Sequence, residues 1–443
     1  MKSHNTMKSP NILYLHSHDA GRCVSPLGFA VETPALMGLA MRGVCFRNAH
    51  TVAPTCSPSR SALLTGLYPH QNGMLGLAHF GFELNCMERH PANRLRDHGY
   101  YSALAGIQHI TEHPESIGFD EILCKESDPE DVGRAAETFL AKMASRGENA
   151  PFFLDIGLNA PHRRNKRFPF AAGDAVDPCY VRPLGTLPDN EETRTDTAEF
   201  LASVQSMDRG FGSVLDALKR WGFEENTLVI CTTDHGPPFP DMKCTLRDDG
   251  TGVFLIMAGP GVPAGTVNSA LVANIDIYPT LLEAAGLTPD DAVEGKSLWP
   301  LIHGDAESVR DCVFGEINYH VSYEPVRSIR TDRWKYIRFF DDHYAQPILP
   351  NCDDGLSRQT MIRRGWLEKI VSREALYDLD LDPLEQSNLI EQPECADTRD
   401  ELRKRLESWM ARTDDPLLKG PIPPIRPKQH LPSTRSPLWF VPR

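Results

Sequence analysis

Residues 51–73, TVAPTCSPSRSALLTGLYPHQNG, are the stretch from which the rest of the chain can be interpreted. Pro58 near its start, an apolar run and Gly66 as a stop predict a short helix. Cys56 then lies at the positive end of that helix, where an anion is favoured because backbone N–H groups point toward it. Arg60 follows one turn later on the same face and can direct further donors at whatever Cys56 carries.

The composition is that of an enzyme-sized chain. Its 443 residues suffice for one large hydrophobic core and a smaller domain. The formal net charge of -14 argues against a nucleic-acid partner, because binding phosphates requires a broad basic surface. An anionic substrate would therefore have to meet a local basic pocket.

The cysteines and the N-terminus point to the reducing interior of a cell. Eleven cysteines form an odd set without tight pairs, which favours free thiols over a disulfide framework. Residues 1–19 contain only a short apolar run, which is too short for a secretory signal or a membrane span. Together with the initiator Met1, this predicts a bacterial cytoplasmic protein with no membrane partner.

Short apolar runs alternate with helical patterns through the first part of the chain. Strands are expected at 11–15, 101–104, 151–158, 228–231 and 253–257, and helices at 34–42, 89–99 and 196–221. A charged stretch, 189–196, is expected to be a solvated loop. Strands that alternate with helices predict an α/β fold built on a large, mostly parallel, doubly wound sheet flanked by helices.

Candidate catalytic side chains come directly after the predicted strands, namely Asp19, His109, His162, Asp234 and His235. Ligands of doubly wound sheets bind at the carboxyl ends of the strands, so we expect these side chains to meet at one edge. Two carboxylates in one place are costly without a cation. Asp19, Asp234 and His235 therefore predict a site for a divalent metal.

From about residue 314 the pattern changes to that of a smaller, C-terminal antiparallel α+β domain. Residues 327–337 alternate as an antiparallel strand pair would, and 397–412 predict a helix. We expect three parts, 1–313, 314–415 and 416–443. The last is a proline-rich extended tail that cannot form a compact unit alone. Its aromatic end predicts an arm that packs on a neighbouring subunit, giving a homo-oligomer, or covers the cleft.

Residues 56–60, Cys-Ser-Pro-Ser-Arg, resemble the Cys-x-Pro-Ser-Arg signature of the type I sulfatases in the alkaline phosphatase superfamily, and 61–73 continue the longer family motif. The sequence around Cys56 is most similar to that of the heparan N-sulfatase branch of the family and its bacterial relatives. The resemblance implies that a formylglycine-generating enzyme converts Cys56 to formylglycine. One hydroxyl of its hydrate would attack the sulfur of a small anionic sulfate ester or sulfamate, and the second would then expel sulfate.

The resemblance also implies one divalent metal, bound by Asp19, Asp234, His235 and the residue at Cys56. The family has Asp-Asp after the first strand, whereas this chain has His18 before Asp19. His18 therefore stands where the first carboxylate would be and is a further candidate ligand. Ca²⁺ is the metal that the family implies. Mn²⁺ is the alternative, because hard Ca²⁺ prefers oxygen ligands to imidazole nitrogens.

Three further residues match family positions around the transferred group. His109 ends a Gly-Ile-Gln-His element in which the family has Gly-Lys-x-His, so Ile107 replaces a lysine. The resemblance makes His109 the base, Lys243 an oxyanion ligand and His162 the group that protonates or hydrogen-bonds the leaving group. A basic cluster could steer an anion or be a solvated loop; it consists of Arg163, Arg164, Lys166 and Arg167.

Two other functions fit the same residues. A phosphonate monoester or phosphate diester hydrolase of the same superfamily also uses formylglycine, and the loss of a cation at Ile107 favours a substrate of lower charge. The other alternative is a non-catalytic, sugar-binding relative that has the fold but not the activity. The intact signature around Cys56 argues against the second alternative.

Overall fold

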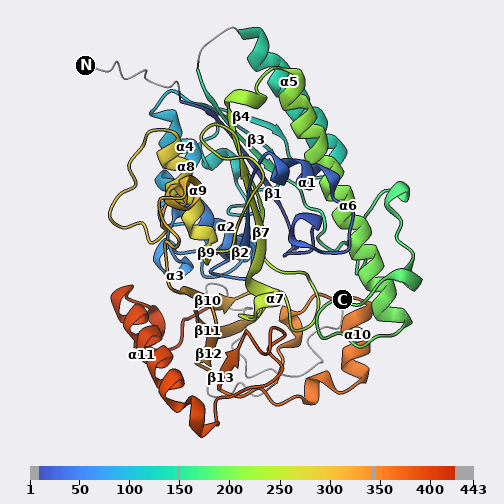
Figure 1. The fold of residues 1–443 in the computed structure, drawn as a ribbon, viewed down its shortest axis with the longest axis vertical. Coiled ribbons are helices and arrows are strands. Elements are labelled where there is room, and N and C mark those ends of the chain that lie inside the picture. The colour runs from blue at the N-terminus through green and yellow to red at the C-terminus, as the bar shows by residue number, and fades with distance from the viewer. Residues whose placement is uncertain (1–8, 147–149, 342–345, 425–443) are drawn as a thin grey trace.

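The computed structural model describes residues 9–146, 150–341 and 346–424 (Figure 1). Among these residues, nine strands form one large sheet in the order β4-β3-β5-β1-β6-β7-β2-β8, with β9 also paired to β2. The strands are β1 (Asn11–Ser17), β2 (Gly43–His50), β3 (Tyr101–Gly106), β4 (Glu121–Cys124), β5 (Phe152–Gly157), β6 (Thr227–Thr233), β7 (Gly252–Ala258), β8 (Thr266–Asn268) and β9 (Val272–Ala273). All neighbours pair in parallel except β7, which is antiparallel to β6 and β2. The predicted, mostly parallel α/β sheet is confirmed.

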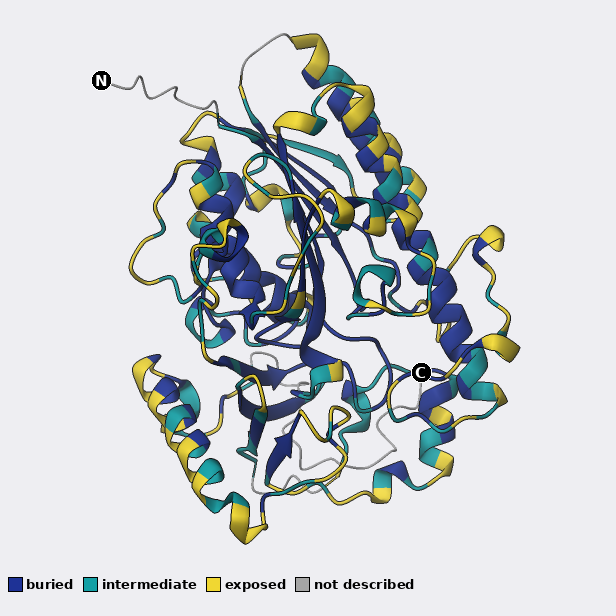
Figure 2. Ribbon diagram, in the orientation of Figure 1, coloured by how far each residue is buried: buried dark blue, intermediate teal, exposed yellow. Residues whose placement is uncertain are grey.

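Helices cover both faces of this sheet (Figures 1 and 2). The helices of the first part of the chain are α1 (Pro34–Met41), α2 (Cys56–Thr65), α3 (Pro69–Asn72), α4 (Pro91–Arg96), α5 (Pro129–Arg146), α6 (Glu191–Arg220), α7 (Asp248–Thr251), α8 (Ile277–Ala284) and α9 (Trp299–His303). Helices α1, α5 and α6 lie on one face, and α2, α4, α8 and α9 lie on the other.

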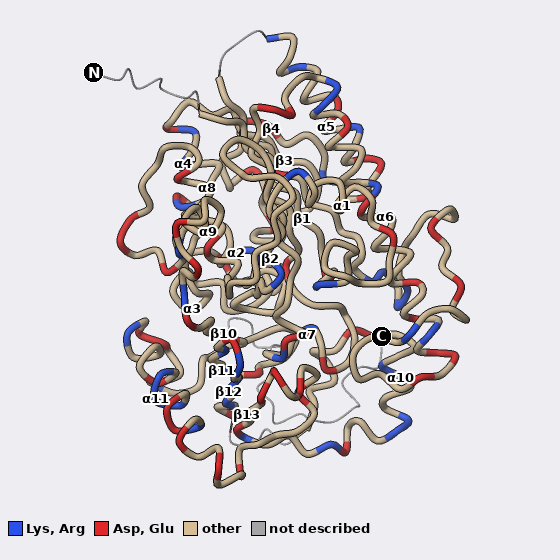
Figure 3. Tube along the Cα trace, viewed as in Figure 1, with Lys and Arg blue, Asp and Glu red and all other residues tan. Residues whose placement is uncertain are grey.

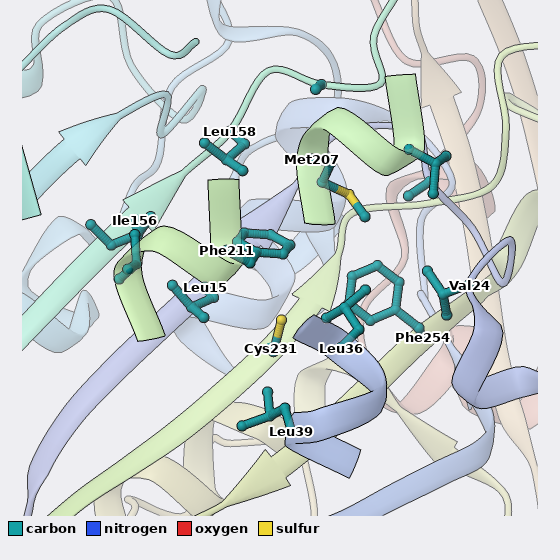
Figure 4. Close-up of a cluster of buried hydrophobic side chains, with 14 of the residues drawn as sticks. Leu15, Val24, Leu36, Leu39, Ile156, Leu158, Met207, Phe211, Cys231 and Phe254 are labelled. Carbon is teal, nitrogen blue, oxygen red and sulfur yellow. The ribbon is translucent and has the colours of Figure 1, made fainter. Parts of the chain in front are cut away.

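The first strand shows how the sequence produces these two layers. Successive side chains of a strand point to opposite faces, so Leu15 joins the cluster that contains Phe211 of α6 (Figure 4), while Tyr14 joins the one that contains Leu63 of α2. A strand covered on both sides needs a continuous apolar run, which residues 12–15 supply in β1. Each large apolar side chain buried in this way contributes about 1.5–3 kcal/mol.

One sequence expectation is wrong in this layer. The stretch 189–196 is not a solvated loop, because α6 begins at Glu191 and Asp196 is only 1% exposed. The side chain of Asn190 accepts a hydrogen bond from Thr193 N at 3.0 Å, and this N-cap starts the helix inside the charged stretch. Asp196 is buried because it is paired with Arg163.

The C-terminal part contains a separate antiparallel sheet. Its strands are β10 (Val313–Tyr319), β11 (Tyr323–Arg330), β12 (Trp334–Phe339) and β13 (Glu374–Asp378), and its helices are α10 (Leu356–Arg363) and α11 (Ala396–Arg412). The four strands pair in chain order. The antiparallel pair predicted at 327–337 and the helix predicted at 397–412 are confirmed. The exact domain boundaries stay a prediction.

A fully buried ion cluster ties the two parts together. Arg327 of β11 donates from Nε to Asp415 at 2.6 Å, and its Nη2 lies 3.5 Å from Glu316 of β10. Glu316 in turn accepts from the backbone N–H of His70 in α3 at 2.8 Å. Arg327, Glu316 and Asp415 are each 0% exposed, so their charges are stabilised by one another rather than by water.

The described start of the predicted tail lies against this part of the molecule. Ile422 is 5% exposed, and Tyr319 donates its hydroxyl proton to Ile422 O at 2.8 Å. The aromatic end of the tail, on which the oligomer prediction rests, lies outside the described residues. Within the described ranges no helix is both long and apolar enough to cross a bilayer. All eleven cysteines lie in these ranges, and none of them forms a disulfide.

Candidate active site

The carboxyl ends of four adjacent parallel strands supply most of the predicted site. His18 and Asp19 follow β1, Asp234 and His235 follow β6, and His162 lies shortly after β5. Asp19 and His109, which follows β3, have left-handed backbones with φ of 61° and 56°. The chain therefore turns sharply as it leaves these strands, and the convergence predicted from sequence is observed.

Five buried side chains form one compact cluster: His18, Asp19, Cys56, Asp234 and His235. One potential ligand atom from each lies within 4.8 Å of all the others. Nε2 of His235 lies 3.4 Å from both Cys56 Sγ and Asp19 Oδ1, and Nδ1 of His18 lies 2.8 Å from Asp19 Oδ1. Cys56 is the first residue of α2, as predicted, and all ten residues of this helix are buried.

The charges around this cluster fit a divalent cation. Among the described residues, ion pairs and hydrogen bonds connect four carboxylates with two cations, which leaves a net charge of two minus when the imidazoles are neutral. The carboxylates are Asp19, Asp234, Asp155 and Asp353, and the cations are Arg60 and Lys243. A mixed set of carboxylate and imidazole ligands suits a divalent metal, and one such ion balances the charge.

Arg60 connects the cluster to β1. It is 2% exposed, and its Nη2 donates to Asp234 Oδ2 at 3.0 Å and to Ser17 O at 2.8 Å. Its Nη1 donates to Nδ1 of His16. This bond requires the neutral imidazole with its proton on Nε2, which lies 2.9 Å from Asp155 Oδ1. Arg60 was expected to reach over the group on Cys56, and in the structure its donors are directed at Asp234 and β1.

Lys243 brings a second cation to the cluster. It is 5% exposed, and its Nζ lies 3.2 Å from Asp19 Oδ2 and 3.0 Å from Asp353 Oδ2. Burial alone would lower the pKa of Lys243, but Asp19 and Asp353 raise it well above its usual value. Burial alone would raise the pKa of Asp19, but Lys243, His162 and His235 lower it to about 2. This ion pair is therefore charged at neutral pH.

Two of the predicted histidines border the cluster. The ring of His162 lies 4.3 Å from that of His18, and its Nδ1 lies 3.7 Å from Asp19 Oδ2. Burial lowers the pKa of His162, and Asp19 opposes that shift. His109 lies farther out, with its ring 5.8 Å from that of His18. Burial and the charge of Arg60 lower the pKa of His109 to about 3. The imidazoles of His162 and His109 are therefore both neutral at neutral pH.

The basic cluster after His162 is paired and does not present free charge to a ligand. Arg163 is buried, forms a fork with Asp196 at 2.7 and 2.8 Å, and stacks on Phe168 with its guanidinium carbon 4.0 Å from the ring centre. Figure 3 shows basic and acidic positions side by side in this region near α6 and α10. The other pairs are Arg164–Asp128, Lys166–Asp354 and Arg167–Glu199.

Besides Asp155, which lies inside β5, three residues of the site region were not foreseen from sequence. Asp353 and His320 come from the C-terminal part, and His79 contacts His109 with 3.3 Å between their ring nitrogens. None of the three follows a strand of the large sheet, so the strand-end argument could not find them.

An unmodified thiol at Cys56 is a poor nucleophile in this environment. Cys56 is 2% exposed, and burial raises the pKa of its thiol, with Lys243 opposing the shift. The thiolate is the reactive form of cysteine, so the environment keeps this side chain in its inert form.

Known proteins resemble the chain over most of its length. The human N-sulphoglucosamine sulphohydrolase is 32% identical and covers 88% of each chain. A solved protein in complex with its substrate D-glucosamine-2-N,6-O-disulfate shares the fold, with a TM-score of 0.70, 21% identity, and coverage of 92% of this chain and 99% of that one. The phosphonate monoester hydrolase of Agrobacterium radiobacter also shares it, with a TM-score of 0.71, 20% identity, and coverage of 91% and 96%.

Two family profiles match. The profile of the N-sulphoglucosamine sulphohydrolase C-terminal region matches residues 242–370, which include Lys243, Asp353 and most of the antiparallel sheet. The Sulfatase profile matches residues 10–287, which include the large sheet and the buried cluster. The chain therefore belongs to the sulfatase family and is a sulfuric ester hydrolase.

Proposed function

We propose that the protein removes sulfate from a sulfated sugar, as an ester or a sulfamate, with a formylglycine made from Cys56. The observation that carries this proposal is the position of Cys56, at a helix N-terminus and within 4.8 Å of two carboxylates and two imidazoles. The proposal that the substrate is a sugar rests on the human relative, whose name states an N-sulfated glucosamine substrate. A formylglycine-generating enzyme is then the partner that matures the chain.

We also propose one divalent metal, held by Asp19, Asp234, His235, the residue at position 56 and His18. When bound, such an ion would polarise the sulfate group and favour ionisation of a hydroxyl on that residue. Ca²⁺ is the metal that the family resemblance implies. Mn²⁺ is the alternative that the two imidazoles support, because nitrogen ligands suit a softer ion.

The surrounding side chains then have separate tasks. Lys243 places a buried ammonium beside the cluster and stabilises the negative charge on the transferred group. Arg60 holds Asp234 in place. His162, which is partly exposed, hydrogen-bonds or protonates the leaving group, and neutral His109 accepts the proton when sulfate is expelled.

Mass analysis of the Cys56 peptide, combined with a substrate panel, tests this function. We expect an aldehyde in place of the thiol and hydrolysis of glucosamine N-sulfate or a sugar sulfate ester. Cys56→Ala should lose this activity by about 10⁴-fold or more, as loss of a nucleophile usually does. Full activity of an enzyme with an unmodified Cys56 thiol would contradict the proposal. Faster turnover of a phosphonate monoester or a phosphate diester than of any sulfate would support the alternative activity.

A further inference from the structure

One carboxylate of the site is accessible from outside the cluster. The side chain of Asp353 is 20% exposed, whereas those of Asp19 and Asp234 are 0% and 1% exposed. Asp353 lies between the short 3₁₀ turn Leu349–Asn351 and α10, in the C-terminal part of the chain. It is fixed at one oxygen by the 3.0 Å contact with Lys243 Nζ. A substrate that approaches Lys243 therefore also meets Asp353.

Three polar groups around Lys243 have unused hydrogen-bonding capacity. Within the described residues, Oδ2 of Asp353 is buried, lies 3.0 Å from Lys243 Nζ and accepts no hydrogen bond. Nδ1 of His320 and Nδ1 of His162 are also buried and have no hydrogen-bond partner there. His320 is 7% exposed, and the charges of both Lys243 and Asp353 act on it. Buried polar groups are normally satisfied, so this set points to a ligand that supplies the missing partners.

The chemistry of the set defines the ligand. A carboxylate accepts hydrogen bonds from hydroxyl or ammonium groups, and a neutral imidazole can accept or donate one. An aromatic or aliphatic leaving group would leave these atoms unpaired, which disfavours its binding. A sugar ring carries hydroxyl groups on the carbons next to the sulfated position and can satisfy them.

We propose that Asp353 is a specificity-determining residue that binds a hydroxyl or amino group of the sugar next to the sulfated atom. This inference rests on the proposed function and extends it to the residue that determines selectivity for the leaving group. Lys243 also contacts Asp19 at 3.2 Å, so replacement of Asp353 leaves this ammonium with a buried partner beside the sulfate.

A matched pair of sulfamates tests the role of Asp353. Glucosamine N-sulfate and cyclohexyl sulfamate share the N–S bond and a six-membered ring, but only the first carries hydroxyl groups. For Asp353→Ala we expect kcat/KM on glucosamine N-sulfate to fall about 30-fold, as for a lost hydrogen bond to a charged group, and that on cyclohexyl sulfamate to change by less than about threefold. Asp353→Asn keeps the side-chain volume. Its kcat/KM should also fall more on glucosamine N-sulfate than on cyclohexyl sulfamate, but by a smaller factor than in Asp353→Ala.

The matched control is Asp354→Ala. Asp354 is the neighbouring carboxylate, pairs with Lys166 and Arg358, and should leave both rates unchanged. Equal losses on the two sulfamates in the Asp353 variants would show that Asp353 only positions Lys243, and would overturn the inference. No loss on either would overturn it as well.

Calorimetric binding of the two sulfamates separates this inference from the proposed function. It is measured with Cys56→Ala protein, which binds without turnover. Selective weakening of glucosamine N-sulfate binding in the Asp353 variants supports the inference even if hydrolysis of that compound is absent. Undetectable binding of glucosamine N-sulfate to the protein with Asp353 intact would overturn it.

Discussion

Nε2 of His16 lies 2.9 Å from Oδ1 of Asp155, and both side chains are buried beneath the cluster that holds Asp234. Asp155 keeps the imidazole proton on Nε2, so that Nδ1 is free to accept from Arg60. The pair therefore determines the position of Arg60 without touching the substrate. This arrangement resembles the way outer hydrogen bonds orient the ligands of metal sites.

Asp155→Leu should loosen Arg60, because the His16 proton is then free to move to Nδ1 and oppose the guanidinium. We expect kcat/KM to fall at least about tenfold and the free energy of unfolding to fall by about 2 kcal/mol. Steady-state kinetics and urea denaturation measure the two effects. Asp120→Asn, which alters a carboxylate bonded to Ser102 on the same sheet, should affect stability alone. An unchanged kcat/KM in Asp155→Leu would show that His16 does not position Arg60.

His18→Asp should shift the metal preference toward Ca²⁺. The change replaces an imidazole in the buried cluster with the oxygen donor that Ca²⁺ prefers. We expect Ca²⁺ affinity to rise by about tenfold relative to Mn²⁺ affinity. Calorimetry on metal-free protein measures both affinities without relying on turnover, and chelation of the metal should lower the Tm. Identical ratios in the wild type and the variant would show that His18 is not a ligand.

Asp208 should make stability depend on pH. It accepts backbone hydrogen bonds from Ala35 and Leu36, and burial raises its pKa from 3.8 to about 6, opposed by those two bonds. The native state therefore holds this proton more tightly than the unfolded chain. The stabilisation is fully present below pH 3.8 and is lost as the pH rises through about 6.

The variant Asp208→Asn isolates this effect. Between pH 4 and 7, the unfolding free energy of the wild type should fall by up to about 3 kcal/mol relative to that of the variant. Urea denaturation of both proteins at each pH gives the difference, in which the other titrating groups cancel. A difference that does not vary with pH would exclude the raised pKa of Asp208.

Breaking the buried ion cluster between the two sheets should destabilise the whole molecule. Asp415→Ala leaves Arg327 buried without its closest partner, and we expect a loss of about 3–5 kcal/mol. The double variant Arg327→Met/Asp415→Leu removes both charges and should recover part of that loss. Urea unfolding, followed by fluorescence and circular dichroism, measures both. A double variant less stable than Asp415→Ala would contradict this account.

The sequence predicted the parts of the site that follow from strand order. Asp19, His162 and Asp234 could be placed together because parallel strands end at a common edge. The same pattern could not reveal that β7 runs antiparallel, since an apolar run has no direction. Nor could it show that Arg163 is neutralised, because Asp196 lies 33 residues away along the chain.

The C-terminal contribution to the site was also out of reach of the sequence. Asp353 contacts Lys243 only because the fold brings the C-terminal part against the loop that follows β6. The signature around Arg60 predicted a donor near Cys56 but not its partners, because those depend on His16 and Asp234 of two other segments.

The burial of the whole of α2 bears on whether Cys56 can be modified before or after the chain folds. All ten of its residues are buried, including Cys56 and the Pro58 and Arg60 that a modifying enzyme would recognise. A thiol buried in this way is not accessible to a second protein in the folded structure. The formylglycine that we propose would therefore have to be installed while the chain is still being made or is otherwise unfolded. Chain that has already folded with an intact thiol should stay inactive, however much modifying enzyme is added later.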